Sequence, residues 1–162
     1  DWSNDRLIPD CVKSWSSNKK VTIRSPNSIR PWQHVLDVIN GYIILAKKLN
    51  SNKNLHGQSF NFGPKQNFSD AKVIDILQLI KKDWPSIKWK VQNDKTLKET
   101  KLLKLITKKA RKELKWRQVL SLNQTIQFVA SWYKNYYFDK KNIDKITFKQ
   151  IELYKELILQ NK

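Results

Sequence analysis

Glycine is scarce in this sequence, and its scarcity limits the folds that the chain can adopt. The three glycines, Gly41, Gly57 and Gly63, lie far apart. A dinucleotide-binding fingerprint needs glycines at fixed spacing between a strand and a helix, and a P-loop needs a comparable run before a Lys. Neither motif can be written anywhere in the chain. The sequence therefore excludes a complete doubly wound nucleotide-binding sheet.

Hydrophobic periodicity predicts a mostly helical chain with three short strands. The expected helices cover residues 8–15, 35–49, 70–84, 107–114 and 147–159, and a further one begins at residue 121. The expected strands cover residues 21–24, 59–63 and 87–91. We therefore expect a mixed, helix-rich α/β fold that forms a single domain over residues 1–162, a length sufficient to bury a core.

Apolar residues at helical spacing predict which helix faces are buried. In the expected helix 35–49 the core face would hold Val35, Ile39, Tyr42, Ile43 and Ala46. In the two following long helices it would hold Val73, Ile74, Ile76, Leu77, Ile80, Ile126, Val129, Ala130 and Tyr133, with Trp116 filling the core between them. We expect Ser69 or Asp70 to cap the helix that ends at Trp84. A basic linker, 140–145, would precede the last helix.

The cysteine and methionine contents bear on the cellular compartment and on whether the chain is part of a longer polypeptide. Cys11 is the single cysteine, which fits a reducing cytoplasm, and one Cys with two His cannot make a zinc site. No run approaches the ~20 apolar residues of a membrane helix, so we expect a cytoplasmic protein with no membrane contact. The chain opens with Asp1 and contains no Met. We interpret it as a piece of a longer polypeptide or as a trimmed chain.

The net charge of +18 raises the question of a nucleic-acid partner. Most of the basic residues are Lys, spread over nearly every segment, and few Arg are present to read bases bidentately. This even distribution of Lys indicates a compositional bias and disfavours a nucleic-acid-binding surface. A basic nucleic-acid-binding module is kept as the alternative from a different functional class.

One short segment, residues 24–37, has the composition of an anion site. Arg30 stands between Ile29 and Pro31, and the proline removes a backbone donor and holds Arg30 extended. A guanidinium on a stiff segment matches the oxygens of a phosphate. We expect Trp32 and the face that contains Val35 to anchor it. Taken alone, the segment also fits a surface salt bridge at a loop–helix junction.

Several stretches share residues with a known family. They are the stretch from Asp1 to Asp10, Ile29-Arg30-Pro31-Trp32-Gln33-His34-Val35-Leu36, Asn61-Phe62-Gly63-Pro64, and segments 108–116, 131–134 and 147–154. Together they resemble the carboxy-terminal half of the nucleotide-sugar 4,6-dehydratases, which belong to the extended short-chain dehydrogenase/reductase (SDR) family. The Ile-Arg-Pro-Trp-Gln-His stretch resembles the CDP-glucose branch in particular.

The resemblance implies a substrate-binding domain that has been separated from its catalytic half. In this family the amino-terminal half holds NAD in a Rossmann fold and carries the catalytic Tyr and Lys. The enzyme oxidises C4 of the sugar, eliminates water across C5–C6 and returns the hydride to C6. These 162 residues would therefore contain no catalytic, cofactor-binding or metal-binding residue and would be inactive alone. The substrate domain of another extended-SDR dehydratase or epimerase is the alternative.

By similarity, eight residues would bind a CDP-glucose-like nucleotide sugar. Arg30 would pair with the pyrophosphate, and Arg6 and Leu7 would border the ligand. The strand from Val21 through Ile23 to Arg24 would lie beside the base, with its backbone groups able to read the polar edge. Asn61 would lie near the ligand, and Lys101 would supply a further phosphate contact.

Two departures from the family pattern and one physical consequence follow. Ile106 stands where relatives have Asp, and Lys115 stands where relatives have the Gly of a left-handed helix end. A domain built to pack against a missing Rossmann half would also expose an apolar face, and such faces promote self-association.

Overall fold

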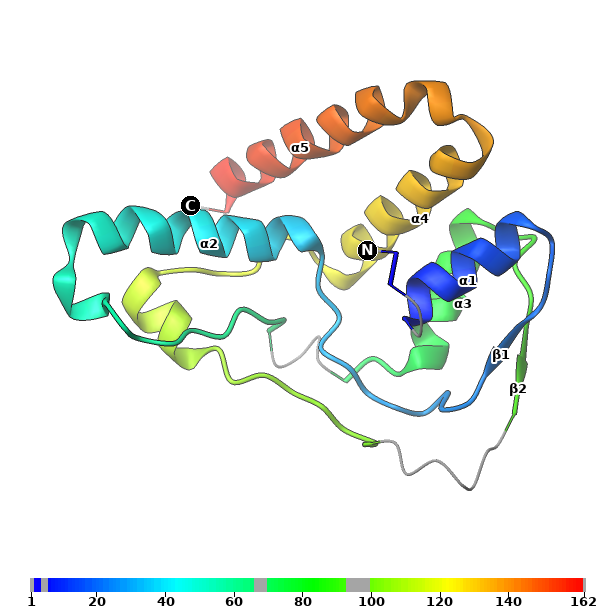
Figure 1. The fold of residues 1–162 in the computed structure, drawn as a ribbon, viewed down its shortest axis with the longest axis horizontal. Coiled ribbons are helices and arrows are strands. Elements are labelled where there is room, and N and C mark those ends of the chain that lie inside the picture. Colours follow the sequence, from blue (N-terminus) through cyan, green and yellow to red (C-terminus); the bar gives the residue numbers. More distant parts are fainter. Residues whose placement is uncertain (1, 4–5, 66–69, 93–99, 162) are drawn as a thin grey trace.

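The computed structural model describes residues 2–3, 6–65, 70–92 and 100–161, and it has two halves (Figure 1). One half holds helix α1 (Leu7–Ser16), strand β1 (Val21–Ile23), helix α3 (Val73–Asp83), strand β2 (Trp89–Val91) and helix α4 (Leu122–Phe138). The other half holds helix α2 (Val35–Ser51), the short turn η1 (Lys53–Leu55), the π-helical turn η3 (Ala110–Leu114) and two extended segments, 58–65 and 100–107. The short turn η4 (Lys140–Asn142) leads into helix α5 (Ile143–Gln160).

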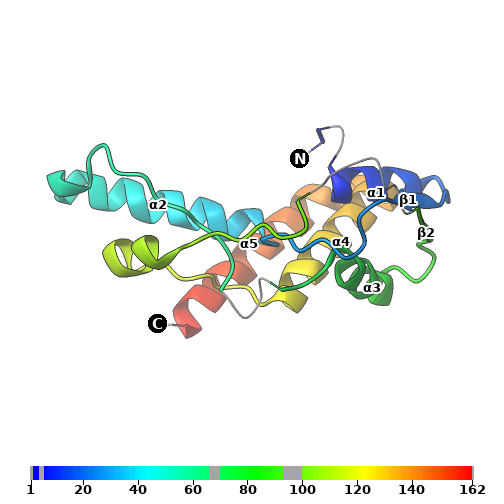
Figure 2. The ribbon, with the colours of Figure 1, turned by 90° about the horizontal axis from the view of Figure 1, so that it is seen from below.

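Figure 2 shows the same two halves from below. Helix α5 runs from the end of α4 towards the half that holds α2. The prediction of a mixed, helix-rich α/β fold is confirmed. Within the described ranges, none of the helices combines the length and the apolar character that a membrane crossing requires.

The regular sheet of the described residues is a single parallel pair. Val21 lies opposite Trp89, and Ile23 lies opposite Val91, so the first and third predicted strands are confirmed with slightly shorter bounds. The second prediction, a strand at 59–63, is wrong. That segment is extended, but its tie to the neighbouring segment is a side-chain bond, from the Asn61 amide to the Ile106 carbonyl at 3.4 Å, and not a backbone ladder.

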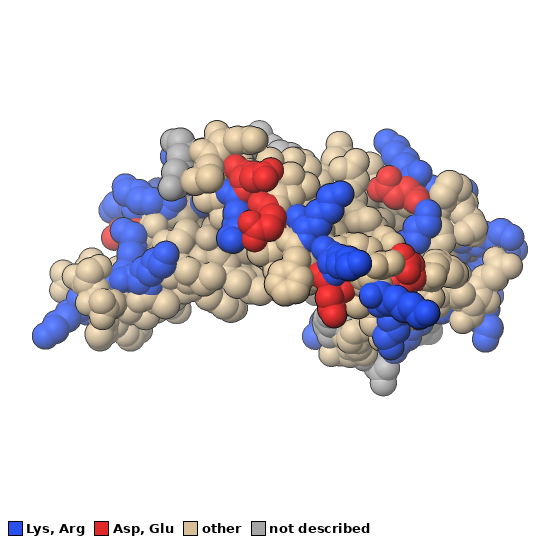
Figure 3. Space-filling view, turned by 90° about the horizontal axis from the view of Figure 1, so that it is seen from above, with Lys and Arg blue, Asp and Glu red and all other residues tan. Residues whose placement is uncertain are grey.

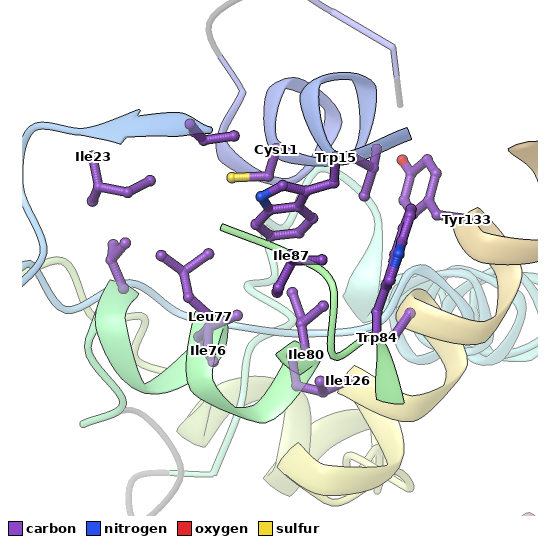
Figure 4. Close-up of a cluster of buried hydrophobic side chains, with 14 residues drawn as sticks. Cys11, Trp15, Ile23, Ile76, Leu77, Ile80, Trp84, Ile87, Ile126 and Tyr133 are labelled. Carbon is purple, nitrogen blue, oxygen red and sulfur yellow. The ribbon is translucent and has the colours of Figure 1, made fainter. Parts of the chain in front are cut away.

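The main core lies between α1, α3 and α4, with the sheet at its border (Figure 4). Cys11 and Trp15 come from α1, Ile76, Leu77 and Ile80 from α3, and Ile126 from α4, and all are almost inaccessible to solvent. The predicted core faces of these helices are therefore confirmed. Burial also raises the pKa of the Cys11 thiol to about 12, which makes it unreactive at neutral pH.

A second core cluster supports α2. Leu55, Ala110, Leu114 and Trp116 are buried there and pack against Ile44, Leu45 and Leu49 of α2. Trp116 is 1% exposed, as its predicted core position requires. A third, smaller cluster of Leu120, Phe128 and Tyr154 joins α4 to α5.

The predicted core face of α2 is wrong. Val35, Ile39, Tyr42 and Ile43 are 60, 44, 59 and 50% exposed, and Ala46 is exposed as well. The helix is apolar on two faces, and the face that contains Gly41, Ile44 and Leu45 packs against the second cluster instead. Periodicity reveals apolar faces but cannot say which of two will be covered.

Two predicted element boundaries also change. Helix α5 begins at Ile143, so residues 140–145 form η4 and the first turn of α5 and not a linker. Helix α3 begins at Val73, and the Lys72 amide donates to the Asp75 carboxylate at 2.9 Å. Asp70 is therefore not its cap, and Ser69 lies outside the described residues.

Lys115, at a position where the resemblance implies glycine, ends η3 in a left-handed conformation. Its φ and ψ are 58° and 19°, and the N–H groups of Lys115 and Trp116 both point to the Ala110 carbonyl. A left-handed backbone costs a residue with a Cβ roughly 1–2 kcal/mol. The departure therefore strains the turn without changing it.

We expect Lys115→Gly to stabilise the protein by about 1 kcal/mol, because glycine removes this strain. Chemical denaturation followed by circular dichroism measures the change. Lys108→Gly is the matched control, since Lys108 is exposed on a right-handed turn seven residues earlier, and there glycine should cost up to about 1 kcal/mol. Equal effects at the two positions would contradict the assignment of strain to Lys115.

Candidate functional site

The segment that carries Arg30 is fixed by backbone bonds on both sides. The Ile29 amide donates to the Lys101 carbonyl at 2.9 Å, and the Leu103 amide donates to the Ile29 carbonyl at 3.2 Å. On the other side, the Val73 amide donates to the Ser28 carbonyl at 3.0 Å. Residues from three distant parts of the sequence thus meet around Ile29. The predicted stiffness of this segment comes from these bonds as well as from Pro31.

The Arg30 guanidinium is held by the same arrangement. Its Nη1 donates to the Ile29 carbonyl at 2.9 Å and to the Thr100 carbonyl at 2.8 Å, and the residue is half-buried. Two bonds from one nitrogen fix the plane of the group. Arg30 and Lys101 are therefore brought together, because Lys101 follows Thr100 directly.

Trp32 anchors the segment, as predicted. Its indole N–H donates to the Ala71 carbonyl at 2.9 Å, and its ring packs against the main core. The other expected anchor, the face of α2 that contains Val35 and Ile39, is exposed.

A buried histidine, His34, caps the first turn of α2 at the end of this segment. His34 is 8% exposed, its Nδ1 accepts from the Leu36 amide at 3.2 Å, and its ring meets the Phe128 ring edge-on at 5.5 Å between centroids. Burial lowers the pKa of His34 to about 4. A cap that accepts at Nδ1 requires the neutral ring, so His34 is a structural residue of the site.

Asp37, three residues on, is fully buried. Its Oδ1 accepts from the Val119 amide at 2.8 Å and from the Tyr154 hydroxyl at 2.9 Å, and its backbone carbonyl accepts from the Trp116 indole at 3.1 Å. Burial raises the pKa of Asp37, while the bonds from Val119 and Tyr154 act in the opposite direction. The pattern of apolar residues gives no indication of this network, because in that pattern Asp37 is only a polar residue between apolar ones.

In the strand that was expected to lie beside the base, the side chains of Val21 and Ile23 point inwards. Val21 and Ile23 are 8% and 3% exposed, and both belong to the main core. Their backbone groups face β2, since the Val21 amide donates to the Lys88 carbonyl and the Gln92 amide donates to the Ile23 carbonyl. In a parallel ladder alternate residues bond to opposite sides, so the amide and carbonyl of Thr22 face the other edge.

Thr22 is exposed, and sequence reasoning missed it. Which residue of a strand offers its backbone outwards depends on the partner strand, and the paired residues of β2 lie 68 positions further along the chain. Arg24, directly after β1, is exposed.

The remaining predicted residues are spread over the surface. Arg6 is exposed at the start of α1, and Leu7 is half-buried against the main core. Asn61 lies in the other half of the molecule, bound to Ile106, which is 77% exposed. A small cavity between α3 and α4, lined by residues such as Leu79, Lys82 and Gln127, includes none of the eight predicted residues.

Comparison with solved structures identifies the fold class of the chain. No protein-family model matches the sequence. The fold matches the crystal structure of UDP-glucuronic acid 4-epimerase from Bacillus cereus in complex with UDP-glucuronic acid and NAD, with a TM-score of 0.67 and 22% identity over 81% of this chain and 40% of that one. It also matches dTDP-glucose 4,6-dehydratase from Bacillus anthracis in complex with NAD, with a TM-score of 0.59 and 16% identity over 88% of this chain and 42% of that one. The chain therefore has the fold of the carboxy-terminal part of an extended SDR.

Sequence similarity points to one group of enzymes within this fold class. The chain is 35% identical over 136 residues to CDP-glucose 4,6-dehydratase from Salmonella typhimurium, which covers 83% of this chain and 37% of that protein. The resemblance to the nucleotide-sugar 4,6-dehydratases of the extended SDR family is thus confirmed. The chain spans about two fifths of the length of the relatives that it matches.

We expect stability to fall as the pH is lowered from 6.5 to 4, because the folded state holds His34 neutral while the unfolded state protonates near 6.5. The pKa is depressed on folding, so the stabilisation is present above 6.5 and lost towards 4, on the order of 3 kcal/mol in all. Urea denaturation at stepped pH measures it. His34→Asn, which retains a capping acceptor, should remove this component, whereas the exposed control His56→Asn should leave it. An unchanged pH profile in His34→Asn would contradict the assignment.

Proposed function

We propose that this chain is the nucleotide-sugar-binding part of a CDP-glucose 4,6-dehydratase-like lyase. The observation that carries the proposal is the fixed Arg30, which stands in the stretch shared with that branch and lies beside Lys101. A guanidinium whose plane is set before the ligand arrives loses little conformational freedom on binding a pyrophosphate.

The surroundings of Arg30 support an anionic ligand. Lys101 adjoins the carbonyl that Arg30 bonds, Arg24 lies on the same connection between β1 and α2, and both are exposed. The outward backbone groups of Thr22 can serve the polar edge of a base, whereas the backbone groups of Val21 and Ile23 are already bonded to the β2 side. Arg6 and Leu7 on α1, and Asn61 on the other half, would complete the ligand contacts.

In the related dehydratase, the part that has no counterpart in these 162 residues would carry out the chemistry. In that proposal NAD and the catalytic Tyr and Lys come from the unmatched part, and this chain orients the nucleotide. Alone it would bind the ligand weakly and convert none, because one wall of the cleft is absent.

A second candidate is the corresponding part of a nucleotide-sugar 4-epimerase. The higher TM-score with UDP-glucuronic acid 4-epimerase favours it, as does 23% identity over 81% of this chain to UDP-glucose 4-epimerase from Mycoplasma pneumoniae. The two candidates differ in the base that they select, uracil or cytosine. The base preference of the isolated chain therefore separates them.

Titration of CDP and CDP-glucose, followed by Trp fluorescence, tests the proposal. Trp32 lies two residues from Arg30 and supplies a nearby fluorophore. We expect saturable binding that prefers CDP over UDP and dTDP. Arg30→Ala should weaken it at least tenfold, Arg30→Lys should be intermediate because it keeps charge without the fork, and the exposed Arg117→Ala should change nothing.

The controls address folding and polyanion binding. Arg30 also bonds two carbonyls, so each variant is compared with the parent chain by circular dichroism and thermal unfolding. A preference for UDP would favour the epimerase candidate. Binding only to a short DNA duplex, with a log–log salt slope of about −0.9 per phosphate contact, would favour a basic nucleic-acid module.

A further inference from the structure

The carboxyl-terminal ends of α1, α3 and α4 lie together at one end of the molecule (Figure 1). Trp84 directly follows α3, and its ring meets the ring of Phe138, the last residue of α4, edge-on at 5.6 Å between centroids. A hydrogen bond joins the side chains of Tyr137 and Ser16, the last residue of α1. Five aromatic side chains here keep part of their surface exposed, and we call them the aromatic end: Trp2, Trp132, Tyr136, Tyr137 and Phe138.

The ring at the centre of the aromatic end, Tyr136, is already covered by the protein. The Trp132 ring is stacked on it at 5.4 Å and 15°, and the Trp2 ring lies 4.8 Å away. The Lys140 Nζ lies 5.2 Å from the centroid of the same ring. A nucleic-acid base needs a free ring face on which to stack. Phe138, by contrast, is 60% exposed and has no polar group, so it projects an apolar edge and offers no hydrogen bond.

Lysines surround the aromatic end. Residues 134–149 contain five Lys against two Asp, and the loop after α1 adds the exposed Lys19 and Lys20. One of the two acidic groups, the Asp139 carboxylate, accepts from the Asn142 side-chain amide at 3.0 and 2.9 Å. The view from above shows Lys and Arg side chains around uncharged surface at this end of the molecule (Figure 3). The surface is therefore apolar at its centre and basic at its border.

This combination fits the surface of an anionic membrane. Trp and Tyr concentrate where lipid meets water, because their rings are amphipathic, and Lys is attracted to anionic headgroups. A second copy of the chain is disfavoured, since each copy has a net charge of +18. We propose that the aromatic end binds the surface of a membrane that contains anionic lipid. Phe138 enters the boundary between headgroups and acyl chains, and Lys140 and Lys141 contact the lipid phosphates.

Such a contact needs no spanning helix. The expectation of no membrane contact rests on the lack of a spanning segment, whereas surface binding depends on buried apolar area together with attraction to anionic lipid. Nucleotide binding takes no part in the contact. A failure of CDP binding therefore leaves this inference intact, and the two proposals can be tested separately.

A fluorophore attached to a single thiol tests which part of the molecule meets the lipid. Cys11 is 0% exposed, so the native thiol is not labelled. Phe138→Cys carries acrylodan at the aromatic end, and Ile106→Cys carries it in the other half, at a residue that is 77% exposed. Each labelled chain is mixed with vesicles of phosphatidylcholine alone, or of equal parts phosphatidylcholine and phosphatidylglycerol. We expect a blue shift of the emission at position 138 with the anionic vesicles only, and no shift at position 106.

Paired charge variants separate a local contact from attraction by the overall charge. The double variant Lys140→Ala, Lys141→Ala should lower the affinity for anionic vesicles roughly tenfold or more, since each Lys near an anionic surface contributes roughly fivefold. The double variant Lys47→Ala, Lys53→Ala removes the same charge from exposed positions in the other half and should have little effect. Vesicle flotation measures both affinities, and thermal unfolding compares each variant with the parent chain.

Three results would overturn the proposal. The first is the absence of binding to the anionic vesicles. The second is an equal loss of affinity in the two double variants, or a blue shift at position 106 as large as that at position 138, since either would show attraction without a defined surface. The third is a shift at position 138 with a single-stranded oligonucleotide but not with vesicles, which would assign the aromatic end to nucleic acid.

Discussion

Asp37 joins α2 to two other parts of the molecule through its carboxylate and its backbone carbonyl. It lies in the first turn of α2, and its bonds reach residues 79, 82 and 117 positions further along the chain. Through Trp116 it meets the second core cluster, and through Tyr154 it meets the third. Burying a charge is costly, and the hydrogen bonds from Val119 and Tyr154 offset part of that cost. The Tyr154 bond thus adds a polar link between α2 and α5 to the apolar packing of the third cluster.

The same region sets the geometry of the candidate site. Arg30 lies on the connection that leads into α2, and Asp37 lies in the first turn of α2. The connection is fixed at Ile29 by backbone pairing and at Trp32 by an indole bond. His34 then begins the helix. The Arg is therefore oriented by neighbours on both sides, and the helix behind it is locked to the rest of the protein.

Much of the fold could be predicted from local patterns. The stripes of α3 and α4 are each apolar on one face, so periodicity identified their buried residues, and the alternation of Val21, Thr22 and Ile23 identified β1. The failures have a common cause. Residues 59–63 look like a strand but find no ladder, and the two apolar faces of α2 are equivalent until the tertiary structure covers one of them. Both questions are decided by distant residues.

The candidate site divides in the same way. Arg30 was identifiable because Pro31 restricts its backbone locally. Thr22 was not, since only the register with β2 shows which residue of β1 offers its amide and carbonyl to the free edge. Asp37 carries no local pattern at all. The bonds of these residues are made over separations that a sequence window does not span.

The parallel pairing of β1 with β2 has a consequence for folding kinetics. Residues 21–23 have no strand partner until residues 89–91 exist, and Asp37 waits for Tyr154, near the end of the chain. Contacts of such high sequence separation require the entropy of large loops to be lost before any bond is gained, which slows folding. During synthesis the amino-terminal half therefore emerges without its partners, and its apolar segments are exposed to solvent and to other chains until the last helix is complete.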